Sequence, residues 1–144
     1  MSYKGKIYKL VSSKTDKIYI GSTTRKYLNS RLSNHKYDYE CYTNKTREKH
    51  YMTSFEIVKY DDCKIELIEE ITFNHKYELL GKEGYHINNN INICVNKIIN
   101  DGLTPTEKHR KHFNKYLENN RDKWNKYQNE YKKKKRMLAE AKIN

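Results

Sequence analysis

The sequence has no long hydrophobic run, and this shortage argues against an integral membrane protein. No apolar stretch approaches the roughly 20 residues that a membrane-spanning helix needs, so we expect no membrane partner. The start of the chain, Met1 to Gly5, also lacks the apolar core of a signal peptide. We therefore expect an intracellular protein, in the cytoplasm or the nucleus.

Cysteine is also scarce, and its spacing excludes two kinds of stabilising site. Cys41, Cys63 and Cys94 are odd in number and far apart, which suits neither a disulfide framework nor a zinc motif. We interpret them as thiols in a reducing compartment. The sequence contains no recognisable zinc finger or helix-turn-helix, so it does not predict high specificity for a DNA sequence.

Positive charge is what the sequence has in excess. It contains 30 Lys or Arg against 18 Asp or Glu, a formal net charge of +12, and only 35% of its 144 residues are hydrophobic. This composition suits one small domain of roughly 100 residues with an appendage. Because such a charge attracts polyanions, nucleic acid is the expected partner, and an anionic membrane surface is the competing interpretation.

Apolar periodicity predicts an α/β domain over residues 1–100. Alternation predicts antiparallel strands at 6–11, 17–21 and 63–71, and the first is expected to be central because both of its faces carry apolar groups. Helical spacing predicts helices from about Arg25, capped by Ser22–Thr24, and at 48–59 and 75–89, with a loop at 39–49. The expected fold is a three-stranded antiparallel sheet flanked by helices.

A change of composition near Gly102 and Pro105 predicts a boundary, followed by a basic tail at 101–144. The tail holds 13 Lys or Arg against 6 Asp or Glu. Its segment 113–116, Phe-Asn-Lys-Tyr, recurs eleven residues later as Trp-Asn-Lys-Tyr, which predicts one long amphipathic helix. The expected aromatic stripe consists of Phe113, Tyr116, Leu117, Trp124, Tyr127, Tyr131 and Leu138.

Several short motifs stand in a fixed order within the first domain. Lys6-Ile7-Tyr8 is followed after eleven residues by Tyr19-Ile20-Gly21, and then by Ser22-Thr23. Arg31 with His35, Lys82-Glu83 and the segment Cys94-Val95-Asn96-Lys97 come after them. In this order, from about residue 5 to 97, the chain resembles the catalytic domain of GIY-YIG endonucleases, including the small domains found in viruses and mobile elements.

The residue types in these motifs suit phosphodiester cleavage. Tyr8 and Tyr19 can project from paired strands to the same side, and Arg31 and His35 share one helix face. Arginine can hold a phosphate in a two-pronged grip. Glu83 offers a hard oxygen ligand for Mg²⁺, which takes one or two carboxylates together with water and substrate phosphate. A free phenol has a pKa near 10, so Tyr8 needs cationic neighbours to act as a base.

The resemblance implies a role for each of these residues. Glu83 would bind Mg²⁺ or Mn²⁺, and Tyr8 would act as general base or orient the attacking water. Tyr19 would hydrogen-bond near the phosphate, and Arg31, supported by His35, would stabilise the developing negative charge. Structural support of the site would come from Gly21 and Asn96. The chain departs from the family pattern at Lys6, which replaces a glycine, and at His86, which replaces a large aromatic residue.

Other interpretations remain open at this stage. The tyrosines could be core residues, Arg31 a solvated helix charge, and Asn92 could replace Asn96 in its role. The chain could also be a catalytically inactive nucleic-acid-binding module.

The tail has two candidate roles of its own. Its basic cluster Lys132, Lys133, Lys134, Lys135 and Arg136 is a candidate for DNA binding, and oligomerisation through the tail helix is the alternative. The resemblance leaves the biological role open among homing, restriction, repair and viral genome processing.

Overall fold

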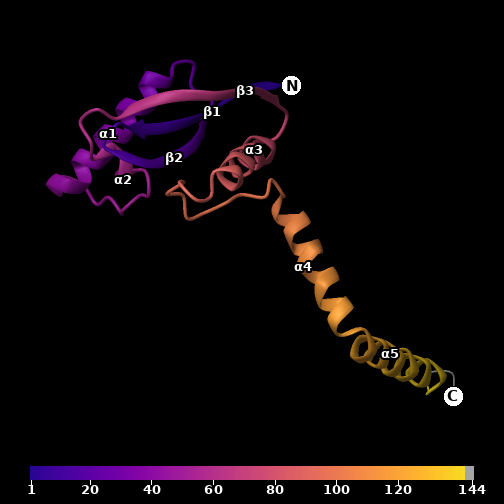
Figure 1. Ribbon diagram of the computed structural model, residues 1–144. Coiled ribbons are helices and arrows are strands. Elements are labelled where there is room, and N and C mark those ends of the chain that lie inside the picture. The colour runs from indigo at the N-terminus through magenta and orange to yellow at the C-terminus, as the bar shows by residue number, and fades with distance from the viewer. Residues whose placement is uncertain (142–144) are drawn as a thin grey trace. The chain divides into compact units, whose positions relative to one another are not determined.

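A three-stranded antiparallel sheet forms the centre of the first part of the chain (Figure 1). The structure is a computed structural model that describes residues 1–141. Its strands are β1 (Tyr3–Ser12), β2 (Thr15–Thr23) and β3 (Lys64–Phe73), in the order β2-β1-β3. The three predicted strands are confirmed, and the first of them is central as expected.

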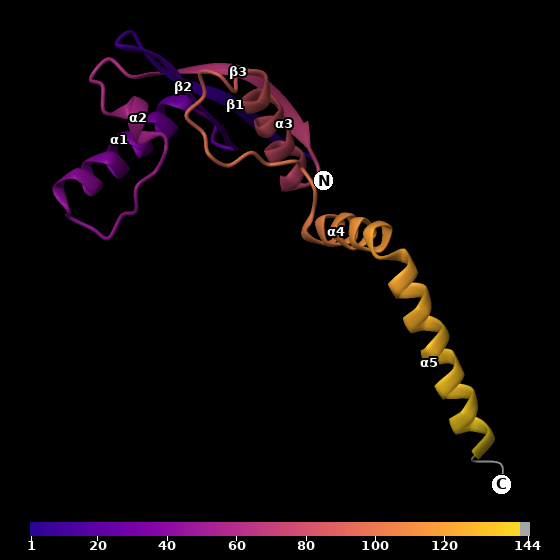
Figure 2. The ribbon, with the colours of Figure 1, turned by 60° about the horizontal axis from the view of Figure 1, so that its bottom comes forward.

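Helices cover both faces of the sheet, because each strand alternates two sets of apolar residues (Figure 2). Ile7 and its neighbours pack against α3 (Lys76–Asn89) on one face. Tyr8 and its neighbours face α1 (Leu28–Asn44) and α2 (Phe55–Val58) on the other. The predicted third helix is confirmed, and the domain is an α/β fold with a flanked antiparallel sheet.

The start and length of α1 differ from the prediction. Ser22 and Thr23 do not cap it, because they pair with β1 as the last residues of β2. The N-cap is Tyr27, which makes no capping hydrogen bond through its side chain. The helix then continues to Asn44 through the segment predicted as a loop, because Cys41 is buried and the Tyr39 ring packs edge-on against Phe55 at 5.4 Å.

The predicted helix at 48–59 is wrong except for its last turn, α2. The apolar spacing that suggested it is real, but its contacts form without a helical backbone. The Tyr51 ring stands perpendicular to Phe55 with centroids 6.0 Å apart, and it also contacts Tyr42 of α1. Ring packing against α1 therefore positions this segment.

The segment after α3 completes the first unit, which ends at Leu103. It crosses α3 at two glycines that share one helix face. A Cβ on Gly84 would lie 1.8 Å from the carbonyl oxygen of Asn100, and a Cβ on Gly81 would lie 2.9 Å from the Cα of Gly102. Gly102 itself has a φ of 77°, which favours glycine. The sequence placed the boundary at 100/101, so the structure adds residues 101–103 to the first unit.

The second unit begins at Thr104 and contains two helices, where one was predicted. A capping box between Thr104 and Glu107 starts α4 (Pro105–Asn119), and α5 spans Arg121–Ala141. Asn120 separates them because its backbone leaves the helical conformation. The last residues of the predicted tail, 142–144, lie outside the described residues.

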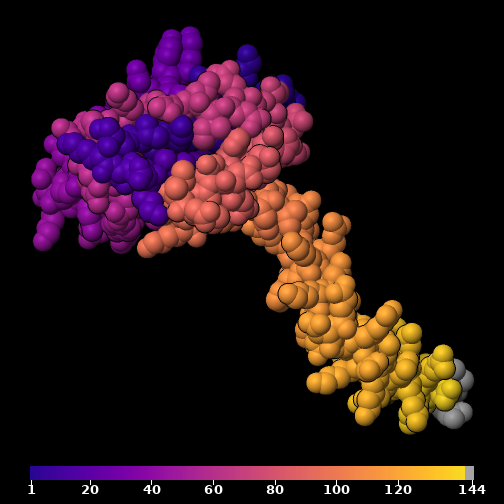
Figure 3. All heavy atoms as spheres, in the orientation of Figure 1, coloured from indigo at the N-terminus to yellow at the C-terminus, as the bar shows by residue number. Residues whose placement is uncertain are grey.

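The aromatic stripe of the tail is only partly covered. The Phe113 ring of α4 meets Trp124 of α5 edge-on at 6.0 Å, and Trp124 also contacts Tyr127. Within residues 104–141 no residue is buried, and the space-filling view shows side chains projecting on both sides of α5 (Figure 3). Across residues 1–141, no helix combines the length and the apolar character needed to cross a membrane.

Candidate active site

Tyr8 and Tyr19 lie on the same face of the sheet, as predicted. Tyr8 pairs with Gly21 across the β1–β2 ladder, and Leu10 pairs with Tyr19. Because side chains two residues apart in a strand share a face, this register places both tyrosines on the side of α1. The His35 ring of α1 stands edge-on to both tyrosine rings, with centroids 5.9 Å from Tyr8 and 5.6 Å from Tyr19.

Gly21 is required by the position of the Tyr8 ring. A Cβ at Gly21 would lie 2.6 Å from the Tyr8 hydroxyl oxygen and 2.8 Å from its Cζ. No side chain larger than hydrogen fits there unless Tyr8 moves. The glycine therefore supports the site by letting the phenol lie across β2, which agrees with the supporting role expected for it.

The hydroxyl of Tyr8 is the centre of a small buried network. Arg31 Nε donates a hydrogen bond to it at 3.0 Å, and His35 Nε2 lies 2.7 Å from it. Tyr8 is fully buried and His35 is 2% exposed. Arg31 and His35 stand one turn apart in α1, so the helix presents both nitrogens to one oxygen.

His35 is neutral in this network. Burial, followed by the nearby charge of Arg31, lowers the pKa of His35 to about 4. Its Nδ1 is buried and has no hydrogen-bond partner within the described residues. The Tyr8 oxygen accepts from Arg31 and shares a hydrogen bond with Nε2 of His35.

Both tyrosines remain protonated phenols around neutral pH. Burial raises the pKa of Tyr8 above its usual value, although the charge and hydrogen bond of Arg31 act in the opposite direction. The negative charge of Glu83 raises it further. Burial also raises the pKa of Tyr19 well above its usual range. Arg31 therefore supplies the cationic neighbour that Tyr8 needs, but does not by itself ionise the phenol.

Glu83 comes from α3, on the opposite face, and meets the site at the edge strand β2. The hydroxyl of Ser22 donates a hydrogen bond to Glu83 Oε2 at 2.5 Å. Burial raises the pKa of this carboxyl, against the lowering effects of Ser22 and Arg31. Ser22 was not predicted as a site residue, because the sequence pattern suggested that it caps a helix. Its strand position, one residue after Gly21, was the available signal.

Asn96 holds the outer edge of β2. Its side-chain amide donates to the Ile20 carbonyl at 2.8 Å, and its Oδ1 accepts from the Ile20 N–H at 2.9 Å. Two backbone hydrogen bonds of Ile18, to Ile93 and from Val95, continue this parallel pairing. Asn96 therefore braces the strand that carries Tyr19, which favours it over Asn92 as the supporting residue.

The two departures from the family pattern have structural contacts. Lys6 Nζ donates to the Lys26 carbonyl at 2.6 Å and pairs with Glu70 at 3.3 Å, so it ties the segment before α1 to the sheet. His86 Nε2 lies 2.8 Å from a carboxylate oxygen of Glu69 on β3. Both side chains stabilise the fold around the site, and neither joins the Tyr8 network.

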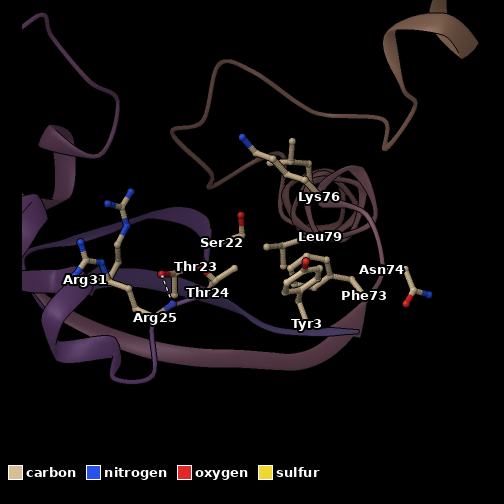
Figure 4. Close-up of a pocket in the computed structure, with 11 residues that line it drawn as sticks. Tyr3, Ser22, Thr23, Thr24, Arg25, Arg31, Phe73, Asn74, Lys76 and Leu79 are labelled. Carbon is tan, nitrogen blue, oxygen red and sulfur yellow. Dashed lines mark hydrogen bonds between the residues drawn. The ribbon is translucent and has the colours of Figure 1, made fainter. Parts of the chain in front are cut away.

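The two partners of the Ser22–Glu83 hydrogen bond line two different clefts. The cleft that we call the Glu83 cleft has a volume of about 590 Å³ and is lined by Tyr19, Tyr51, Glu83, Asn96 and Lys97. The cleft that we call the Tyr3 cleft has a volume of about 550 Å³ and is lined by Tyr3, Ser22, Arg25, Arg31, Phe73 and Leu79 (Figure 4). The carboxylate and the guanidinium thus face neighbouring hollows, where a phosphate could lie between them.

This site offers a metal ion one protein carboxylate, that of Glu83. Within residues 1–141 there is no group of three or more His, Cys, Asp or Glu side chains that could hold a metal. Glu83 alone suits Mg²⁺ or Mn²⁺ only if water and substrate phosphate complete the shell, which is common for Mg²⁺. Its half-buried carboxylate lines the Glu83 cleft and is a suitable anchor for such an ion.

Comparisons with protein-family models, with characterised proteins and with solved structures find no match to this chain. The structure brings Tyr8, Tyr19, Arg31, His35 and Glu83 together on the first unit. The cluster 132–136 is exposed on α5 in the second unit. The chemistry of the assembled residues therefore carries the functional conclusion.

Proposed function

We propose that the protein is a divalent-metal-dependent endonuclease that hydrolyses DNA phosphodiester bonds at a site of the GIY-YIG type. The observation that carries the proposal is the Tyr8 hydroxyl, held by Arg31 and His35 beside the carboxylate of Glu83. These are the residues that the resemblance assigns to catalysis, and they converge from β1, α1 and α3. The basic tail would add affinity for DNA.

Each residue has a distinct task in this mechanism. A divalent cation bound at Glu83 would supply Lewis-acid stabilisation and lower the pKa of water. Arg31 has N–H donors beyond the one used on Tyr8 and would bind a non-bridging phosphate oxygen. Tyr19, on the wall of the Glu83 cleft, would donate a hydrogen bond to the same phosphate. His35 would fix the orientation of Tyr8 through its hydrogen bond to the hydroxyl and its edge-on ring contact.

Tyr8 would handle the proton of the attacking water. Tyr8 would first release its own proton to solvent, and hydrogen bonds from Arg31 and His35 would stabilise the phenolate. As the water oxygen bonds to phosphorus, its proton would pass to Tyr8, the bond from phosphorus to the leaving sugar oxygen would break, and that oxygen would take a proton from a second water molecule. The negative charge of Glu83 raises the pKa of Tyr8, so a cation held at Glu83 would make the phenolate easier to form.

One observation favours the alternative of a catalytically inactive binding module. Tyr8 is fully buried and its hydroxyl is already hydrogen-bonded within the protein, as in an ordinary core tyrosine. In that case the basic surface would bind nucleic acid without cutting it. The two functions differ in whether a phosphodiester bond is broken.

Incubation of the full chain with supercoiled plasmid tests the proposal. We expect open-circular product with Mg²⁺ or Mn²⁺, and none with EDTA, measured on an agarose gel. Binding is measured in parallel by gel shift in EDTA. Binding without nicking at any metal concentration would support the inactive module and contradict the nuclease.

The contribution of the tail can be measured as a salt dependence. Five consecutive helical residues surround the helix, and Lys132, Lys135 and Arg136 form one group that falls within about 100° of one another. Replacing these three by glutamine should weaken DNA binding and make log K less steep in log salt by up to about 2.7, at roughly 0.9 per phosphate contact. The measurement is a fluorescence-anisotropy titration at several salt concentrations.

A charge-conserving control isolates the effect of charge in the tail. The triple variant Lys132→Arg, Lys135→Arg and Arg136→Lys should retain the salt slope of the unchanged chain. An unchanged slope in the glutamine variant would contradict phosphate contact by this face of α5. Sedimentation of both variants tests the alternative role of the tail. If this face of α5 serves oligomerisation, the glutamine variant should sediment with a lower mass, and its slope of log K against log salt should not change.

A further inference from the structure

The Tyr3 cleft is built differently from the catalytic centre beside it. Its floor is apolar: the Tyr3 and Phe73 rings lie 5.8 Å apart with a tilt of 31°, and Leu79 packs beside them. Gly5 permits this floor, because a Cβ there would lie 2.8 Å from Leu79 and 2.9 Å from Phe73. The reaction proposed above uses none of these apolar residues.

Ring exposure distinguishes the two aromatic residues of the floor. Phe73 is 6% exposed, whereas Tyr3 is 52% exposed. The buried Phe73 ring therefore supports one side of Tyr3, and much of the Tyr3 ring remains open. An exposed aromatic ring that is held in place from behind is a stacking surface for another flat ring.

Polar and cationic groups surround this floor. Figure 4 shows Tyr3, Phe73 and Leu79 together, Arg25 and Arg31 at the far end of the cleft, and Ser22 between them. Lys76 of α3 also lines the cleft. A ligand that complements it would have a flat apolar ring at one end and negative charge at the other, and a volume of about 550 Å³ is sufficient for a group of nucleotide size.

The position of Arg31 links the cleft to the reacting phosphate. Arg31 lines the Tyr3 cleft and hydrogen-bonds Tyr8, and Ser22 lines it and hydrogen-bonds Glu83. A DNA strand whose phosphate lies between Arg31 and Glu83 would have a neighbouring nucleotide within reach of this cleft. The occupant is continuous with the substrate.

We propose that the Tyr3 cleft binds one unstacked nucleotide of the DNA substrate, whose base stacks on Tyr3 while Arg25 and Lys76 contact its phosphates. This inference rests on the proposed nuclease function and narrows its substrate class. A base inside a duplex must leave its stack before it can enter, and an unpaired base does so most easily. The substrate class is thus DNA with an unpaired nucleotide next to the cleavage point.

A binding assay without cleavage tests this assignment. The full chain is titrated in EDTA with two short duplexes that carry the fluorescent base 2-aminopurine, either as a single-nucleotide bulge or paired with thymine. We expect about tenfold tighter binding of the bulged duplex, in line with the value of one base-aromatic stack. We also expect quenching of its fluorescence on binding, because the base stacks on Tyr3.

Variants assign the effect to Tyr3. Tyr3→Leu retains an apolar contact with Phe73 and should lose both the preference and the quenching, whereas Tyr3→Phe should retain them. Tyr85→Leu is the matched control, because Tyr85 is 57% exposed and lines neither cleft. Thr24→Glu places a negative charge at an exposed position of the cleft and should also abolish quenching, which keeps the test valid if Tyr3→Leu fails to fold.

The outcomes separate the cleft from the reaction. Equal binding of the two duplexes, or a preference that survives both Tyr3→Leu and Thr24→Glu, would overturn the assignment of the cleft. If the same preparation still nicks plasmid in that case, the nuclease proposal is supported and only the assignment of the cleft fails. A Tyr3-dependent preference in a protein that never cuts would support the cleft and contradict the nuclease.

Discussion

Glu83→Gln is expected to abolish plasmid nicking and to leave DNA binding in EDTA unchanged. The carboxamide retains an oxygen that accepts the Ser22 hydrogen bond but loses the charge that would hold a divalent cation. The measurement is the rate of open-circle formation at saturating Mg²⁺, with gel shift as the binding assay. Glu66→Gln is the matched control, because Glu66 is an exposed carboxylate of β3 that pairs with Lys9.

The stability of the Glu83 variant distinguishes lost chemistry from lost folding. Burial raises the folded-state pKa of this carboxyl, so ionised Glu83 destabilises the fold above that pKa. The glutamine variant should therefore have a Tm equal to or above that of the unchanged chain at neutral pH. The difference should shrink as pH falls through the raised pKa. Nicking at the unchanged rate would show that another carboxylate holds the metal.

Tyr8→Phe is expected to slow nicking by about 10²- to 10⁴-fold, the usual contribution of a general acid or base. The substitution removes only the hydroxyl that is hydrogen-bonded to Arg31 and His35. Tyr39→Phe is the control, because Tyr39 packs in the same unit by ring contact and lies outside the Tyr8 network. Single-turnover nicking rates with excess enzyme measure the effect.

The pH dependence of the rate identifies the proton acceptor. The pKa of Tyr8 is raised above its usual 10.0, so its basic form becomes more abundant as pH increases through the neutral and alkaline range. The rate of the unchanged chain should rise with pH, by about tenfold per unit if Tyr8 is the base, and the variant should lack this rise. A variant rate within a fewfold of the unchanged chain, with the rise intact, would assign the proton transfer to another group.

A loss of stability must be separated from this loss of rate. Without the Tyr8 hydroxyl, Nε2 of the buried His35 loses its partner, which costs about 1–3 kcal/mol. The half-buried Arg31 also loses one hydrogen bond, but its Nε can turn to water. The variant should therefore unfold at a lower denaturant concentration but remain folded under assay conditions. Circular dichroism at the assay temperature checks this.

Local pattern was sufficient to predict the sheet and α3. The alternation around Ile7 and Tyr8, and around Ile20, follows from a sheet buried on both faces, and a shift by one residue would exchange the two faces. The spacing of Leu79, Glu83 and Ile87 places them on one side of α3. The resemblance to GIY-YIG endonucleases named the five residues proposed for catalysis, and strand and helix periods predicted which of their side chains share a face.

The elements that were mispredicted depend on contacts distant in sequence. α1 extends to Asn44 because Cys41 and Tyr39 find partners in the later segment around Phe55, and the segment before α2 needs no helix once Tyr51 packs on that ring. The tail divides at Asn120, where Phe113 meets Trp124. Helix propensity summed over a window of sequence takes no account of contacts with residues outside that window.

The sequence by itself determined the strands and their faces, because these follow from local periodicity, and the order of its motifs carries the resemblance that names the candidate catalytic residues. Only the tertiary structure decided that Ser22 binds Glu83, that Asn96 braces β2, and that Gly21 makes room for Tyr8. Hydrogen bonds and close approaches between residues as many as 76 apart, as between Ile20 and Asn96, depend on how the elements pack. Packing is a property of the whole fold, so no local segment of the sequence encodes it.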